Sequence, residues 1–176
     1  MGGERARAIA QLHARGLSEA HADILTQRMR SVSLEPGEPL LTYGTDHDTL
    51  YLLVEGRLAV TVPMGGGELE LGKVQAGHWV GELHLIDGGP STASLRAVEH
   101  CSMLSIDHAL LDALEEEEPA VASNLLTLIA RDLAMRLRRT STGLIQRTGD
   151  TWRLAKPPER KGWLSQAISW LQGGSE

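Results

Sequence analysis

The chain alternates between two kinds of hydrophobic pattern. Residues 4–15 and 18–30 carry apolar side chains at helical spacing, with Gly16 between them and Ser18 placed to cap the second segment. From about residue 31 to 106, turn residues interrupt short apolar or alternating runs every eight to twelve positions. These runs are Leu50–Val54, Leu58/Val60/Val62, Leu69/Leu71, Leu95/Ala97 and Leu104/Ile106. Such spacing predicts short antiparallel strands in a sandwich or roll.

After Asp107 the pattern becomes helical again. An acidic run, 115–118, ends a short apolar segment, and Pro119 suits the first turn of a new helix. We expect this long helix to span residues 119–146. Its apolar side recurs at steps of three and four residues, at Leu126, Ile129, Leu133, Leu137, Thr140 and Leu144. Because this spacing suits a partner helix, we expect a homodimer formed through helix 119–146.

Residues 147–176 form a separate region after this first domain, residues 1–146. Pro157 and Pro158 indicate a linker, and residues 163–171 have the spacing of a short amphipathic tail helix. We expect the tail to pack on its own domain or dimer partner, the alternative being that it docks on another protein. Docking on a membrane surface is less favoured, because the polar face of the tail lacks dense Lys and Arg.

Composition narrows the function classes. The chain is 41% hydrophobic and 23% charged, as expected for a soluble globular protein with a real core. Only six aromatic residues and a net charge of −6 disfavour single-strand binding by base stacking and general phosphate-backbone binding. No apolar stretch is long enough for a membrane span, and no secretory core follows the N-terminus. We therefore expect a cytoplasmic protein.

The chain shows no motif for catalysis or metal binding. Its seven histidines lack metal-ligand spacing, and no serine lies in a nucleophile motif. Residues 65–67, Gly-Gly-Gly, lack the ending of a phosphate loop and read as a hairpin turn. Cys101 is the single cysteine and is most simply a small core residue. We expect neither enzymatic activity nor a metal site.

Four motifs follow each other in an order that resembles the cyclic-nucleotide-binding domain of the catabolite activator family. They are Leu-Glu-Pro-Gly-Glu-Pro-Leu at 34–40, Leu-Tyr-Leu-Leu-Val-Glu-Gly-Arg-Leu at 50–58, Gly-His-Trp-Val-Gly-Glu-Leu at 77–83 and Pro-Ser-Thr-Ala-Ser at 90–94. The resemblance covers residues 18–146. It implies an α+β fold in which an antiparallel β-roll (double-stranded β-helix or jelly roll) is flanked by N-terminal helices and a long C-terminal dimerisation helix.

The same resemblance bears on ligands and partners. It implies a small-molecule effector, cyclic AMP or cyclic GMP, with no obligatory cofactor. The family's transcription factors carry a helix-turn-helix domain after the long helix, and about 30 residues are too few for one. We therefore expect no direct DNA binding.

The candidate ligand-binding residues lie at the two ends of the family's phosphate-binding cassette. They are Gly81, Glu82, Leu83 and His84, followed by Ser91, Thr92 and Ala93. A glycine lets the backbone approach a ligand closely, and a carboxylate can accept a hydrogen bond from a sugar hydroxyl. The resemblance places Glu82 at the ribose 2′-hydroxyl. The alternative is a tight turn with a solvated acid.

Ser91 departs from the family, which places an arginine there against the cyclic phosphate. Loss of a charge-assisted hydrogen bond of about 1.5–3 kcal/mol predicts an affinity lower by roughly ten- to hundredfold. Arg96 does not replace the missing charge, because the family often has an arginine there without phosphate contact. His84 either lends positive charge to an anion or simply fills the pocket.

The segment Arg-Leu-Arg-Arg-Thr-Ser at 136–141 resembles the family segment whose Thr-Ser pair reaches the adenine. Thr140 and Ser141 are therefore candidate ligand residues, the alternative being ordinary residues of a dimer helix. Five arginines make this helix basic, at positions 131, 136, 138, 139 and 147. We interpret them as a solvated face.

Two functions remain. The first is a stand-alone regulatory sensor module with weak or altered cyclic nucleotide binding, and this is the interpretation we favour. The alternative is a degenerate interaction or scaffold module that binds no small molecule and acts through its dimer helix and Trp-rich tail.

Overall fold

The structure, a computed structural model, describes the backbone of residues 2–148 and the side chains of residues 2–138. It divides into two compact units, Met1–Arg136 and Leu137–Glu176, of which the first contains the fold and the pocket. Residues 149–176, with the predicted linker and the tail helix 163–171, lie outside the described residues.

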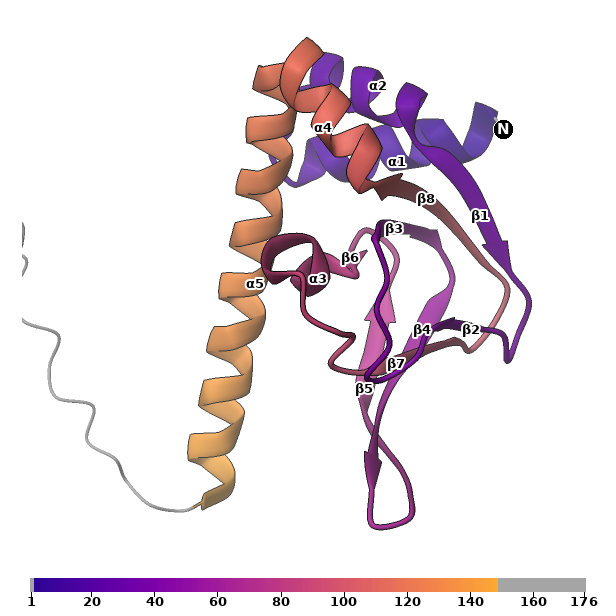
Figure 1. Ribbon diagram of the computed structural model, residues 1–176, viewed down its shortest axis with the longest axis vertical. Helices are drawn as coiled ribbons and strands as arrows, with labels where there is room; N and C mark the ends of the chain where they lie inside the picture. The colour runs from indigo at the N-terminus through magenta and orange to yellow at the C-terminus, as the bar shows by residue number, and fades with distance from the viewer. Residues whose placement is uncertain (1, 149–176) are drawn as a thin grey trace, which may run out of the picture. The chain divides into compact units, whose positions relative to one another are not determined.

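Two helices open the chain, α1 (Gly2–Ala14) and α2 (Glu19–Arg28) (Figure 1). The predicted cap is confirmed, because the Ser18 hydroxyl oxygen accepts a hydrogen bond from the His21 backbone N–H at 3.2 Å. α2 ends slightly earlier than predicted. Met29 has extended dihedral angles and Arg30 already begins the first strand.

Strands of residues 30–107 form two antiparallel sheets of four strands each, with orders β1-β8-β3-β6 and β2-β7-β4-β5. Their bounds are β1 Arg30–Leu34, β2 Pro39–Leu41, β3 Thr49–Glu55, β4 Arg57–Met64, β5 Gly67–Gln75, β6 Trp79–Val80, β7 Ser94–Ala97 and β8 Cys101–Asp107. The predicted β-roll, with helices before and after it, is confirmed. The short helix α3 (Glu82–Asp87) lies between β6 and β7.

Buried apolar side chains form two clusters. The first joins the helices to the β1-β8-β3-β6 sheet and includes Leu12, Leu25, Leu52 and Trp79. The second lies between the two sheets. Among the described residues, Trp79 is the single aromatic residue of the largest fully buried side chains, and Cys101 is fully buried as predicted. The core is therefore aliphatic, which agrees with the scarcity of aromatic residues in the sequence.

The turn between β3 and β4 requires a glycine. Gly56 has a φ of +93°, and a Cβ atom there would lie 2.5 Å from the His100 carbonyl oxygen and 2.7 Å from the Cys101 Sγ. No other residue fits this position without moving the backbone of the neighbouring turn.

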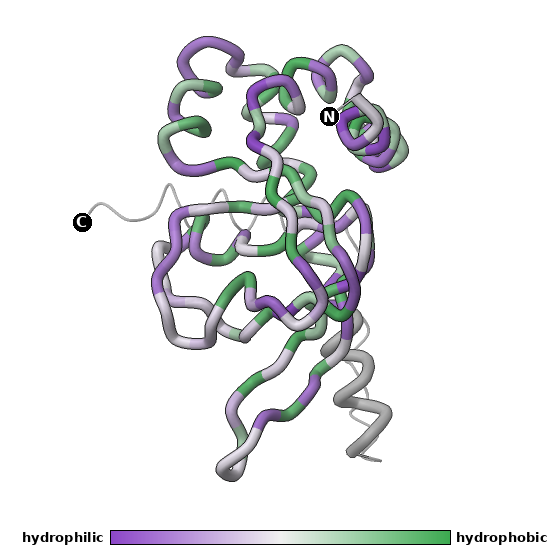
Figure 2. The backbone as a smooth tube through the Cα atoms, turned by 90° about the vertical axis from the view of Figure 1, so that its right-hand side faces the viewer, coloured by the Kyte–Doolittle hydropathy of each residue, from purple (hydrophilic) through white to green (hydrophobic). Residues whose placement is uncertain are grey.

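The β4–β5 hairpin carries the predicted glycine turn at residues 65–66. Figure 2 shows hydrophobic and hydrophilic residues alternating along this hairpin, which extends away from the rest of the roll. Met64, Leu69 and Leu71 are exposed there, so these three positions do not contribute to the core, whereas Val74 of β5 packs against the second cluster.

Two helices follow the roll, α4 (His108–Glu117) and α5 (Pro119–Thr148), and Pro119 begins α5 as predicted. The apolar positions predicted as a dimer seam do not share one role. Ile129 is fully buried in its own domain and Leu133 packs against the same core, whereas Leu126 is 37% exposed. The interpretation of Ile129 as an intermolecular contact is therefore wrong.

Arg15, directly after α1, joins three parts of the first unit. Its guanidinium donates to the Gly77 carbonyl oxygen before β6 and to the Asp132 carboxylate on α5. The Asp132 side chain is only 5% exposed. α1, the roll and the first turns of α5 are thus held together by a buried ion pair as well as by apolar contacts.

Candidate functional site

The site is built where β6 ends and α3 begins. Gly81 has a φ of +86°, and a Cβ atom at this position would lie 2.6 Å from the Thr49 carbonyl oxygen and 3.1 Å from the His47 ring. Only glycine fits such a close approach in this conformation. Its turn places Glu82 at the first position of α3, at the base of the roll.

Glu82 is buried, with 6% of its surface exposed. The Arg136 guanidinium, from α5, donates hydrogen bonds to the Glu82 Oε1 and to the Trp79 carbonyl oxygen. Burial raises the pKa of the Glu82 carboxyl, and the positive charge of Arg136 opposes that rise. The site therefore holds a buried acid whose charge is compensated from a different element.

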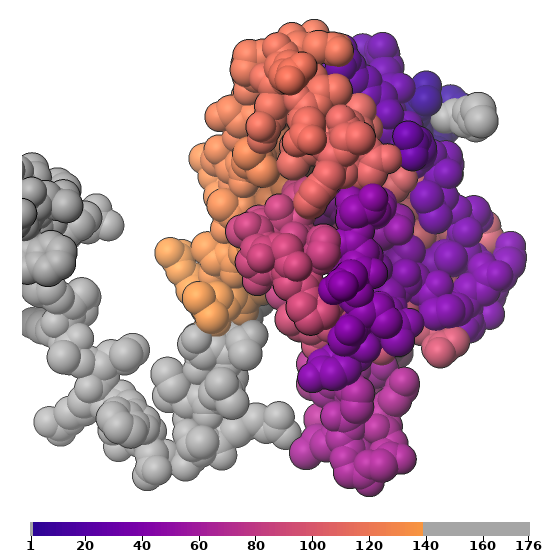
Figure 3. All heavy atoms as spheres, viewed as in Figure 1, coloured from indigo at the N-terminus to yellow at the C-terminus, as the bar shows by residue number. Residues whose placement is uncertain are grey.

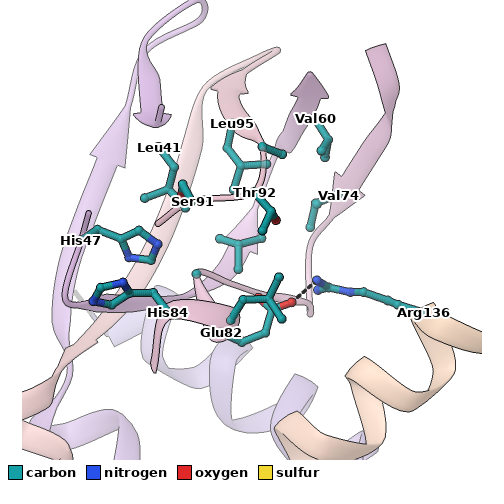
Figure 4. A pocket seen from close by; sticks show the side chains of 14 residues that line it. Leu41, His47, Val60, Val74, Glu82, His84, Ser91, Thr92, Leu95 and Arg136 are labelled. Carbon is teal, nitrogen blue, oxygen red and sulfur yellow. Dashed lines mark hydrogen bonds and ion pairs between the residues drawn. The ribbon is translucent and has the colours of Figure 1, made fainter. Parts of the chain in front are cut away.

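A pocket of about 140 Å³ opens beside this ion pair, between the β2-β7-β4-β5 sheet and the segment formed by β6 and α3 (Figure 4). Its walls are largely aliphatic, and its polar groups come from the loop before β3, from α3, from the segment before β7 and from Arg136. The apolar lining side chains are Leu41, Val60, Val74, Val80, Leu83, Ala93 and Leu95. An apolar cavity with few convergent polar groups is typical of a small-molecule site.

The structure brings the cassette residues of the sequence analysis together. This one pocket is lined by all seven of them: Gly81, Glu82, Leu83, His84, Ser91, Thr92 and Ala93. Thr140 and Ser141 belong to α5, but their side chains lie outside the described residues. Figure 3 shows α3 at the surface between α5 and the early part of the roll.

Ser91 is held firmly at the pocket wall. Its backbone N–H donates to the Thr45 carbonyl oxygen at 2.9 Å, and its own carbonyl oxygen accepts from the Gly44 N–H at 2.8 Å. The residue is buried, so its hydroxyl is a neutral polar group where a cation is expected from the family. Arg96 donates to the Gly37 carbonyl oxygen and does not line the pocket.

Among the titratable residues of the pocket, sequence reasoning missed two, Arg136 and His47. Arg136 is not part of a solvated basic face, because it pairs with Glu82 inside the pocket. Its position four residues before Thr140, within the matched segment, was the signal that could have identified it. His47 lies in an irregular loop, where no periodicity marks a residue that faces a pocket.

The described residues contain no cluster of three or more His, Cys, Asp or Glu side chains that could hold a metal ion. Nor does any helix among them have the length and apolar character needed to cross a membrane.

Comparisons with known proteins agree with this geometry. The family profile described as "Cyclic nucleotide-binding domain" matches residues 31–118. The cyclic AMP receptor protein of Thermus thermophilus is 31% identical over 119 residues, which make up 67% of this chain and 55% of that protein. The CRP-like cAMP-activated global transcriptional regulator of Mycobacterium tuberculosis is 26% identical over 130 residues, 73% of this chain and 56% of that protein.

A solved structure shows the same fold. A cyclic nucleotide-binding domain from Methylobacillus flagellatus superimposes with a TM-score of 0.75 at 22% identity and covers 86% of each chain. The chain spans about half the length of the curated relatives described above. The matched residues include both ends of the cassette and the strands that carry it, and so the chain belongs to the cyclic nucleotide-binding domain family.

Proposed function

We propose that the protein is a regulatory sensor module that binds a cyclic nucleotide weakly and transmits the state of its pocket through α5. The observation that carries this proposal is the Glu82–Arg136 pair, because it joins the pocket directly to α5. A ribose hydroxyl that donates to Glu82 would share the carboxylate with Arg136. Ligand binding would therefore change a contact that holds α5.

The names of the relatives support the ligand class, since one is a cyclic AMP receptor and another is activated by cyclic AMP. Ser91 supports the weakness of binding. A neutral hydroxyl replaces a charge-assisted hydrogen bond of about 1.5–3 kcal/mol, which corresponds to about ten- to hundredfold in affinity.

Isothermal titration with cyclic AMP and cyclic GMP tests the proposal. We expect weak binding to the wild type and binding at least about tenfold tighter to the Ser91→Arg variant, because the new guanidinium pairs with the phosphate. Ser33→Arg adds the same charge at an exposed position of β1 and serves as the matched control. No heat from the wild type at millimolar nucleotide would refute nucleotide sensing.

A second candidate, an interaction or scaffold module without a small-molecule ligand, is favoured by the size of the pocket. Its volume of about 140 Å³ is below the roughly 300–1,000 Å³ usual for small-molecule sites, so a nucleotide must enlarge it. Binding to Ser91→Arg alone would identify a pocket that has lost its ligand. Pull-downs with and without residues 150–176 would then show whether the tail recruits a protein partner.

The proposal also includes a homodimer formed through the exposed side of α5, a cytoplasmic location and a regulatory, non-enzymatic role. Leu126 supports the dimer, because it is an apolar residue exposed on α5. The relatives support the regulatory role, since their names describe a receptor and a transcriptional regulator.

A further inference from the structure

Two histidines from different elements meet at the wall of the pocket. His47 lies in the loop between β2 and β3, His84 lies in α3, and their ring centroids are 4.8 Å apart. Both line the pocket together with Ser91. Figure 4 shows the two rings side by side, away from the Glu82–Arg136 pair.

The backbone fixes which nitrogen of each ring carries a proton. The His84 Nδ1 lies 2.6 Å from the Gly89 carbonyl oxygen, and the His47 Nδ1 lies 3.2 Å from the Thr49 carbonyl oxygen. Because a carbonyl oxygen only accepts, Nδ1 is the donor in both rings. In the neutral rings Nε2 is therefore an acceptor, which repels an anion. Protonation makes each Nε2 a donor with a positive charge.

We propose that His47, His84 and Ser91 form an anion subsite that binds a phosphate- or sulfate-class group when the imidazoles are protonated. The proposal rests on the proposed function only for the nucleotide that would carry this group. Ser91 contributes a neutral hydroxyl, so the positive charge at this end of the pocket depends on pH. The site would therefore lose its affinity for the anion as the two imidazoles lose their protons.

Burial and nearby groups shift the pKa of His47 in opposite directions. Burial and the neighbouring His84 lower the pKa of His47, although Asp46 and Asp48 act in the opposite direction. Two imidazolium rings at this distance repel each other, and an anion bound beside both of them in the pocket offsets the repulsion. The other charged or titratable groups nearby are Asp87 on α3, His108 at the start of α4, and Glu82 and Arg136 on the far side of the pocket.

Anion binding and proton binding are therefore linked, and each strengthens the other. Affinity rises as pH falls through the histidine range. The cyclic phosphodiester keeps its single charge in this range, so the pH dependence belongs to the protein. If this half-buried histidine pair had a purely structural role, the pocket would bind a nucleotide equally well on both sides of the range.

The test is isothermal titration of the full chain with cyclic AMP at about pH 5.5 and about pH 8, at constant ionic strength. We expect affinity at least about tenfold higher at the lower pH. His84→Asn and His47→Asn keep an N–H near the same carbonyl oxygens but cannot titrate, and each should reduce this ratio. His100→Asn lies outside the pocket and should leave it unchanged.

A second measurement separates this inference from the proposed function. Sulfate, whose charge is constant over the same range, should shift the NMR ring resonances of His47 and His84 at about pH 5.5 but not those of His100. Cyclic AMP that binds equally at both pH values would overturn the subsite and leave nucleotide sensing intact. A sulfate response without cyclic AMP binding would support the subsite and overturn nucleotide sensing. Failure of both ligands would overturn both.

Discussion

Burial and the charge of Arg136 shift the pKa of the Glu82 carboxyl in opposite directions. The pKa is raised, so burial has the larger effect. A raised pKa means that the folded state holds the proton more tightly than the unfolded state. The contribution to stability is present below the unfolded pKa and is lost as pH rises through the folded value. Glu82 thus opposes folding at neutral pH, which is common for functional carboxylates.

Glu82→Gln should therefore become more stable relative to the wild type as pH rises from about 4.5 to about 7. The amide oxygen still accepts from Arg136, and the buried charge is gone. Urea unfolding at both pH values measures the difference. Glu99→Gln is the opposite control, because Arg57 lowers the pKa of the exposed Glu99, so that variant should lose relative stability as pH rises.

Gly56 gives a second prediction at this scale. Gly56→Ala should destabilise the fold by about 2–5 kcal/mol, from a left-handed backbone and a clash with the next turn. Gly66 also has a positive φ, but the space around an added Cβ there is open. Gly66→Ala should therefore lower the free energy of unfolding by only about 1–2 kcal/mol. Equal losses in chemical denaturation would show that the clash at Gly56 is relieved by a small shift.

The sequence predicted elements better than it predicted what each face contacts. Ser18, Pro119 and the glycine turn at residues 65–66 marked boundaries correctly because capping and turn chemistry are local. The apolar spacing of α5 was ambiguous, since steps of three and four residues suit a partner helix and a protein's own core equally. Arg136 was misread because a run of arginines does not by itself show which one reaches a buried acid. Only its position four residues before Thr140, in the matched segment, marked it.

At the element scale, the junction made by Arg15 is open to a direct test. Arg15→Ala leaves the buried Asp132 carboxylate without its cation and should lower the free energy of unfolding by about 3–5 kcal/mol. Replacing both partners, Arg15→Met with Asp132→Leu, should restore most of this loss, because no buried charge is left unpaired. If the Arg15→Ala variant were as stable as the wild type, solvent would have to reach the Asp132 carboxylate.

At the scale of the whole molecule, the proposed dimer assigns different roles to two sides of α5. Leu126 and Met135 are similarly exposed, at 37% and 43%, and nine residues place them about 180° apart on the helix. Leu126→Glu should weaken dimerisation by about tenfold or more, and Met135→Glu should not. Sedimentation equilibrium measures both, and a monomeric wild type at micromolar concentration would refute the dimer.

The β-roll and the cassette were foreseen from ordered glycine motifs, because a turn that needs glycine leaves a visible mark in the sequence. The pocket's charges were not foreseen. His47 and Arg136 reach it from a loop and from α5, and only the packing of the first unit brings them to the cassette. Ser91 was predicted as a candidate ligand residue in place of the family's arginine. It lines the pocket, and its part in ligand binding stays a prediction.

The first core cluster has a consequence for how this protein can be recombined. Eleven of its 19 buried residues lie outside residues 31–118, on α1, α2 and α5 or in the segments that join them. The region that matches the family profile is therefore smaller than the region that must fold together. Residues 31–118 grafted alone into another protein would include most of the pocket but lack the helices that complete the core beneath it. Residues 2–136 would include both and could be transferred as one folding unit.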